Sequence, residues 1–178
     1  MTGHRITQVA AAALLAAAPV FAAQAAEGPR VIQAAMPAAG PAIHTVDPAQ
    51  VVRQRLEASC TDRLTTGRYF EADAQLDGTA GADRVFDYGQ ATCGGEPMME
   101  WCGSAGCVKS VWLDDGNGTY REVWEGAAWD VSADADAQTI VIGEHGSACD
   151  VPGYQGCYVE YRVSSSGLSQ VDAEPAQP

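Results

Sequence analysis

The sequence contains few basic residues. Ten Lys and Arg residues stand against 23 Asp and Glu residues, so the 178-residue chain carries a net charge of −13 at pH 7. A surface of this sign repels the phosphates of nucleic acids and the headgroups of anionic lipids. We therefore expect neither nucleic acid nor an anionic membrane surface among the partners of this chain.

The sequence also lacks a long hydrophobic run. The longest one, from Ile6 to Phe21, is shorter than the ~20 apolar residues that span a bilayer. It follows Arg5 and precedes the small-residue segment Ala23-Gln24-Ala25, which is the arrangement of a secretory signal peptide and its cleavage site. We predict a signal peptide over residues 1–25, a location in the periplasm or outside the cell, and no membrane insertion after the signal is removed.

Cleavage after Ala25 would remove one basic residue, Arg5, and no acidic residue. Nine Lys and Arg residues would then remain against 23 Asp and Glu, which gives a net charge of −14. Such an acidic domain attracts positive surfaces over a Debye length and meets them more often. If the partner is a protein, we expect a basic envelope or extracellular protein.

Metal and thiol sites are disfavoured by what the sequence does not contain. It has six cysteines but no Cys-x-x-Cys pair, and only His44 and His145 follow residue 25. A zinc cluster usually needs such pairs or more imidazoles, and a thiolate nucleophile needs an unpaired cysteine. An even number of cysteines in an exported chain instead predicts disulfides, and we expect no cofactor.

The cysteine spacing favours one pairing over another. Two pairs are close in sequence and the remaining two cysteines are left for each other, which gives Cys102–Cys107, Cys149–Cys157 and Cys60–Cys93. An internal repeat, described below, supports an alternative that keeps the second of these bridges and pairs the other four cysteines as Cys93–Cys107 and Cys60–Cys102.

Composition divides the rest of the chain into three parts. Residues 26–46 are rich in Ala, Pro and Gly and are predicted to form a disordered linker. Residues 47–171 form the predicted β-rich domain. Residues 172–178, which contain Ala, Glu, Pro and Gln, are expected to be a disordered tail.

One helix is expected at the start of the domain, roughly over residues 48–60. Asp47 and Pro48 are a helix N-cap and a first-turn proline, and Val52 and Leu56 lie four residues apart on one helical face. We expect this face to pack on a sheet and the end of the helix to carry Cys60 to its bridge.

A β-hairpin is the clearest strand signal. Residues 108–113 alternate in polarity, with Trp112 on one face and Val111 on the other. Residues 114–118, Asp-Asp-Gly-Asn-Gly, favour a tight turn because Gly and Asn tolerate positive φ. Residues 120–124 then alternate again and are predicted to be the return strand.

Two segments of the domain share one order of features. Residues 84–123 and 139–171 both read strand, Cys, Gly-Cys, strand, turn, strand, and Cys107 corresponds to Cys157. The acidic segment Ala133 to Asp136 between them is expected to be a solvated turn. We predict a mainly β fold with antiparallel sheets from two blade-like β-meander repeats, one short N-terminal helix and disulfide staples. The two repeats would stack face to face or continue as one twisted sheet.

The segment from Gln75 to Asp83, which precedes Arg84-Val85-Phe86, resembles the calcium loop of FG-GAP or VCBS-type repeats. In that family acidic side chains at the first, third, fifth and ninth positions hold calcium. Asp77 and Asp83 match the third and ninth positions, whereas Gln75 and Thr79 replace the other two acids. Because calcium binds about six to eight oxygen ligands, several of them charged, the degenerate motif implies a turn with millimolar affinity at best.

The Cys-Gly-Ser-Ala-Gly-Cys segment from Cys102 to Cys107, with the layout around it, resembles small exported bacterial proteins of unassigned function. That resemblance implies no activity. The sequence also lacks the Gly-x-Ser-x-Gly elbow of many serine hydrolases. Candidates for hydrolysis are His145 with Ser147 or a nearby Asp, and a carboxylate pair drawn from Glu122, Glu125, Asp130 and Glu144.

Tyr154 is the candidate binding residue. It lies among glycines inside the predicted loop between Cys149 and Cys157, where a large ring is difficult to bury. It either folds back on the sheet or contacts a partner. We predict an exported, disulfide-stabilised binding or structural module rather than an enzyme. Two alternatives are kept: an inhibitor of a cationic cell-wall hydrolase, and an acid-dependent hydrolase.

Overall fold

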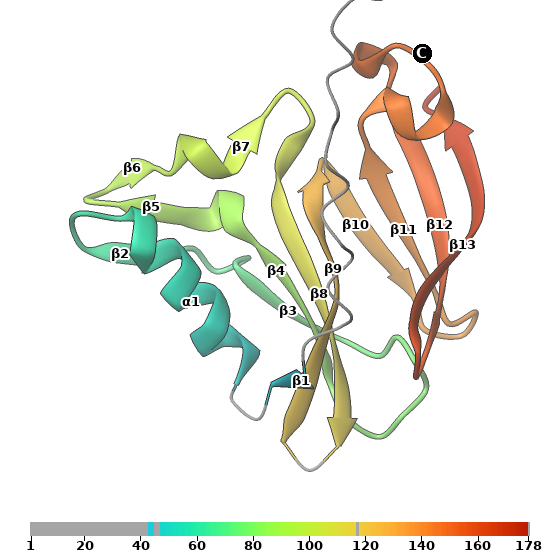
Figure 1. Cartoon of the computed structure of the whole chain (residues 1–178), viewed down its shortest axis with the longest axis horizontal. Helices are drawn as coiled ribbons and strands as arrows, with labels where there is room; N and C mark the ends of the chain where they lie inside the picture. Colours follow the sequence, from blue (N-terminus) through green and yellow to red (C-terminus); the bar gives the residue numbers. More distant parts are fainter. Residues whose placement is uncertain (1–42, 45–46, 117, 178) are drawn as a thin grey trace, which may run out of the picture. The chain divides into compact units, whose positions relative to one another are not determined.

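The computed structural model describes residues 43–44, 47–116 and 118–177. The predicted signal peptide and nearly all of the predicted linker lie outside these ranges. The described residues form mainly antiparallel β-structure with one short N-terminal α-helix and three disulfides, so the predicted fold class is confirmed (Figure 1). In this part of the chain, no helix has the length and apolar character needed to cross a bilayer.

The largest sheet, sheet A, has six strands in the order β1-β9-β8-β4-β3, with β7 paired to β8. Their bounds are β1 (Ile43–His44), β3 (Glu71–Ala74), β4 (Asp83–Asp87), β7 (Cys102–Gly103), β8 (Gly106–Gly116) and β9 (Thr119–Ala128). The β8–β9 hairpin is the predicted one. Gly116 and Gly118 adopt φ values of 84° and 72° at its turn, a backbone conformation that glycine adopts without steric cost.

Sheet C has four strands that lie side by side in chain order: β10 (Asp130–Asp134), β11 (Thr139–Glu144), β12 (Cys157–Ser164) and β13 (Gly167–Pro175). A small sheet B contains β2 (Leu64–Thr66), β5 (Ala91–Cys93) and β6 (Glu96–Pro97). Four short 3-10 helices complete the described elements: η1 (Tyr88–Gln90), η2 (Met99–Trp101), η3 (Gly146–Cys149) and η4 (Gly153–Gln155).

Helix α1 (Pro48–Ser59) covers one face of sheet A. Asp47 caps it by accepting a 3.0 Å hydrogen bond from the Ala49 N–H, as the sequence predicts. Val52 and Leu56 are fully buried in one cluster with Phe86 and Trp112, which project from β4 and β8. The helix therefore contributes to the core through the face that its sequence period indicates.

Sheet C covers the other face of sheet A. Val111 and Leu113, which alternate with Trp112 along β8, pack in a second cluster with Ile140 and Ile142 of β11. Sheet A is thus a shared layer between the helix and sheet C, and the two predicted units stack face to face (Figure 1).

Three segments are more ordered than the sequence indicates. Residues 43–44, placed in the linker, form strand β1 beside β9. Residues 130–134 form strand β10, although part of this segment was expected to be a turn. Residues 172–175, expected in the disordered tail, pair with β12 as the last part of β13. All three lie at sheet edges, where backbone hydrogen bonds to one neighbour suffice and side-chain pattern gives little signal.

Candidate functional site

The loop between Cys149 and Cys157 presents the most exposed aromatic side chain among the described residues. A disulfide joins its ends, and Tyr154 between them is 91 % exposed. The loop contains η4 and the end of η3, and it makes its own backbone bonds. The Val151 N–H donates to the Gly146 carbonyl at 3.0 Å, and the Gln155 N–H to the Pro152 carbonyl at 2.9 Å. Tyr154 therefore stands on a loop that is already ordered.

Two aromatic side chains from outside the loop pack against its glycines. His145 packs so closely against Gly153 that a Cβ at this glycine would overlap the imidazole ring. The Trp129 ring packs in the same way against Gly156, and its indole N–H donates to the Ser104 carbonyl at 3.3 Å. Glycine is thus required at both positions by close approach, and the loop rests on these two rings.

An acidic groove of about 190 Å³ lies on the face of sheet C next to this loop. The strand register places its lining side chains on one face: Val141, Tyr158, Glu160, Asp172 and Glu174. None of the three carboxylates forms an ion pair with a described residue. The half-exposed Tyr158 is one residue beyond Cys157, so this groove begins where the disulfide-closed loop ends.

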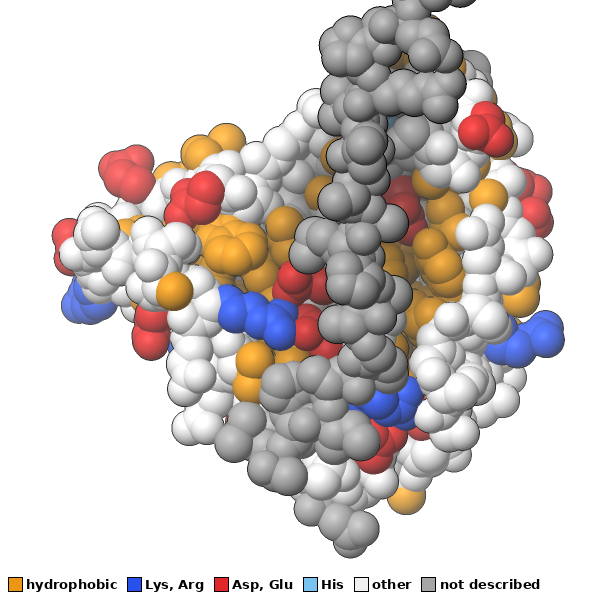
Figure 2. All heavy atoms as spheres, in the orientation of Figure 1, with side chains coloured by type: hydrophobic (Ala, Val, Ile, Leu, Met, Phe, Trp, Pro, Cys, Tyr) orange, Lys and Arg blue, Asp and Glu red, His pale blue; other side chains and the backbone are white. Residues whose placement is uncertain are grey.

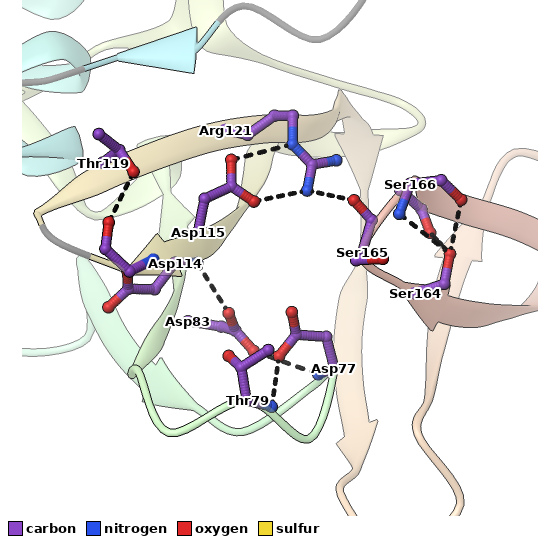
Figure 3. Close-up of polar contacts among 12 residues, drawn as sticks. Asp77, Thr79, Asp83, Asp114, Asp115, Thr119, Arg121, Ser164, Ser165 and Ser166 are labelled. Carbon is purple, nitrogen blue, oxygen red and sulfur yellow. Dashed lines mark hydrogen bonds and ion pairs between the residues drawn. The ribbon is translucent and has the colours of Figure 1, made fainter.

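The segment that resembles a calcium loop is closed by its own hydrogen bonds (Figure 3). The buried Asp83 carboxylate accepts hydrogen bonds from the N–H groups of Leu76 and Asp114, at 2.6 and 3.0 Å. Asp77 accepts one from the Thr79 N–H at 2.9 Å. Burial raises the pKa of Asp83, and the backbone N–H donors oppose this shift. Asp83 thus organises the loop by binding backbone donors.

A cavity of about 230 Å³ lies beside this loop, lined in part by Asp77, Asp114 and Asp115. Arg121 neutralises part of the negative charge of these carboxylates. Its guanidinium donates to Asp115 at 2.7 Å and to the Ser165 carbonyl at 2.6 Å (Figure 3). No cluster of three or more His, Cys, Asp or Glu side chains in the described ranges has the geometry to hold a metal ion.

The residues considered for hydrolysis lie in separate places. His145 Nδ1 is 3.1 Å from Ser147 Oγ, yet no carboxylate of a described residue bonds the other ring nitrogen. Glu144 accepts a 2.9 Å hydrogen bond from the Tyr161 hydroxyl. The same histidine ring supports the Tyr154 loop, which explains its position without catalysis.

Glu122 and Glu125 do come together, but around a cation that sequence reasoning missed. Arg55 of α1 binds both oxygens of Glu122 at 2.6 Å and also pairs with Glu125. The Tyr88 hydroxyl donates to Glu125 at 2.8 Å, and the guanidinium lies 5.6 Å from the ring centre of Trp112. The carboxylates neutralise Arg55 rather than standing free as an acid and a base. We call these five residues the Arg55 network.

Two tyrosines of the structure are expected to resist ionisation. Burial raises the pKa of Tyr88 and of Tyr161, and for Tyr161 the hydrogen bond to Glu144 raises it further. An unfolded chain releases these protons near pH 10, so the folded state holds protons that the unfolded state does not, and stability falls as the pH rises above that value. An absorbance titration at 295 nm should show a late step that coincides with loss of the folded circular dichroism signal. The double variant Tyr88→Phe, Tyr161→Phe should lack this step, and its persistence would contradict the assignment.

Three disulfides join Cys60 to Cys93, Cys102 to Cys107 and Cys149 to Cys157, which are the pairs favoured by spacing over the repeat-based alternative. No described cysteine is free. This number of bridges indicates an oxidising, extracytoplasmic environment. Comparisons with protein-family models, with curated proteins and with solved structures find no match for this chain.

Proposed function

We propose that this protein is an extracytoplasmic binding module that contacts a protein partner through Tyr154. The observation that carries the proposal is the 91 % exposure of this ring on a loop closed by the Cys149–Cys157 disulfide. A tyrosine offers a large contact area and few rotamers, and it is enriched in binding sites for that reason.

The order of the loop lowers the cost of binding. A flexible loop loses conformational entropy when a partner immobilises it, whereas this one is held by its disulfide, by internal backbone bonds and by the rings of His145 and Trp129. The contact energy of Tyr154 would therefore go largely into affinity.

The charge of the surface favours a basic partner. The acidic groove next to the loop holds three carboxylates without ion pairs to described residues: Glu160, Asp172 and Glu174. Elsewhere acidic side chains are scattered over the face shown in Figure 2 rather than gathered in one patch. Such a field speeds encounter but gives little affinity by itself, so the anchor must supply the affinity.

A cationic cell-wall hydrolase is the partner class that fits both features. Its basic surface would be attracted to the groove, and a substrate cleft would admit a protruding, disulfide-closed loop. An inhibitor of this kind acts by occupying the cleft. Replacing Tyr154 should therefore weaken binding to the hydrolase and inhibition of the hydrolase to the same extent.

The proposal predicts that association and dissociation respond to different substitutions. The mature protein and its variants are immobilised, basic proteins are captured from envelope extract, and rates are then measured with the purified partner. Tyr154→Ala should raise the dissociation rate about 10- to 100-fold, as loss of an interface anchor does. The double variant Asp172→Lys, Glu174→Lys should instead slow association severalfold and flatten its salt dependence.

Tyr69→Ala serves as the matched control, since Tyr69 is also strongly exposed, at 63 %, but lies before β3 in sheet A. It should leave both rates unchanged. A partner that dissociates from the Tyr154→Ala variant at the parental rate would show that the loop is not the contact.

A further inference from the structure

A second groove, unlike the acidic groove on sheet C, is lined by arginines. A groove of about 410 Å³ lies between α1, the turn before β3, and strands β3 and β4. Three of the ten Lys and Arg residues of this acidic chain line it: Arg53, Arg68 and Arg84. None of its lining residues belongs to the loop between Cys149 and Cys157, so the groove is independent of the proposed partner contact.

The carboxylates in the groove neutralise one of these arginines. Glu71 and Asp73 also line it, and both pair with Arg84, whose Nε lies 3.1 Å from Asp73 Oδ1. The two acids are therefore directed at the arginine on the neighbouring strand. Their ion pairs leave the other two guanidiniums of the groove without an acidic partner among the described residues.

Arg53 and Arg68 contact aromatic rings instead of acids. The Arg53 guanidinium lies 5.3 Å from the ring centre of the buried Phe70, and that of Arg68 lies 4.3 Å from the ring centre of Tyr69. Neither side chain has an ion pair or hydrogen bond to a described residue. A guanidinium stacked on a ring keeps its N–H donors in the plane of the group, where they are available to another acceptor.

The backbone that carries Arg68 is fixed. The Gly67 N–H donates to the Gln90 carbonyl at 2.8 Å, and the Phe70 N–H donates to the Gly67 carbonyl at 3.1 Å. Arg53 is held by the capped helix α1 on the other side of the groove. The backbone that carries both arginines is therefore ordered before any ligand arrives.

We infer that this groove binds a tetrahedral oxyanion, phosphate or sulfate, free or as the charged group of a small hydrophilic ligand. Arginine side chains recognise the oxygens of phosphate and sulfate through paired, charge-assisted hydrogen bonds, and Arg53 and Arg68 line the same groove. The volume of the groove matches that of small-molecule sites, and its charged lining selects a polar ligand. Because the protein as a whole is acidic, attraction here requires the local cluster and cannot come from the net charge.

The test is calorimetric titration of the mature protein with inorganic phosphate at low ionic strength, repeated with inorganic sulfate. Saturable binding of either ion, with a Kd on the order of millimolar for a single oxyanion held by two arginines, supports the inference. The tighter of the two ions identifies the charged group of the natural ligand. Absence of saturable binding of both ions overturns it.

Single-charge variants separate the site from a general charge effect. Arg53→Gln and Arg68→Gln should each weaken binding at least fivefold, and the double variant should abolish it. Arg162→Gln removes the same charge from an exposed arginine on sheet C and should bind like the parent. Equal weakening by Arg162→Gln would overturn the site. The circular dichroism spectrum of each variant checks that folding is retained, and both groove arginines are exposed at the surface.

Discussion

Replacing Cys60 and Cys93 together with alanine is expected to lower the free energy of unfolding by about 4 kcal/mol, the largest effect of any disulfide in this protein. The bridge joins residues 33 apart, whereas the other two join residues 5 and 8 apart. A crosslink that closes a longer loop removes more conformations from the unfolded chain, and the same relation gives about 2 to 2.5 kcal/mol for the short bridges.

The position of this bridge adds to its effect. Cys60 follows the last residue of α1, and Cys93 ends β5 of the small sheet B. Both side chains pack against the cluster that contains Val52 and Leu56. The bridge therefore fastens the helix and sheet B to each other at the edge of one core.

Urea unfolding of three double alanine variants, one for each disulfide, ranks the contributions of the three bridges to stability. The Cys60, Cys93 variant should have the lowest midpoint, and its slope with denaturant should rise because the unfolded chain becomes less compact. A Cys102, Cys107 variant that is less stable than this one would show that loop entropy does not set the order.

Signals within a few tens of residues predicted much of this fold. The turn glycines Gly116 and Gly118 fix the β8–β9 hairpin, and the alternation around Trp112 correctly separates its two buried faces. Asp47 and Pro48 mark the start of the helix correctly. Each of these features depends on local backbone preferences or on side-chain period, and both are visible in a single sequence.

The features that escaped prediction depend on distant pairings. Strands β1 and β10 are edge strands, and each pairs with a single neighbour. In sheet B, β2 pairs with β5, which lies more than twenty residues further along the chain. The groove between α1 and β3 is built from residues of α1, β2, β3 and β4 and of the turn that precedes β3. The exposure of Tyr154 could be predicted because glycines and a short disulfide loop are local signals, whereas the acidic groove beside it needs the register of β12 with β13.

The Arg55 network is the clearest case of a distant pairing. Arg55 meets Glu122 and Glu125 across separations of 67 and 70 residues. On a helix that also carries Arg53, Gln54 and Glu57, a single arginine looks like any solvated side chain. Only the packing of α1 on sheet A shows that its guanidinium lies over Trp112 and beside two acids.

Replacing Arg55 with methionine is expected to lower the free energy of unfolding by about 2–3 kcal/mol, between the values for exposed and for buried ion pairs. Methionine keeps the apolar stem against Trp112 but leaves Glu122, whose side chain is only 17 % exposed, without its bidentate partner. The hydrogen bonds with Glu122 also raise the pKa of the Arg55 guanidinium, so the cation is present at every pH at which the protein folds.

Arg53→Met is the matched control, because Arg53 lies on the same helix, is exposed, and has no ion pair with a described residue. It should cost less than about 1 kcal/mol, the value of one exposed cation–π contact. Adding Glu122→Gln to each variant completes the test. In the Arg55→Met background, Glu122→Gln should lower the free energy of unfolding by less than it does in the parent, because the carboxylate that it removes has already lost its partner. If the two arginine variants were equally stable, or if the effects of Arg55→Met and Glu122→Gln were additive, the network would not fasten the helix to the sheet.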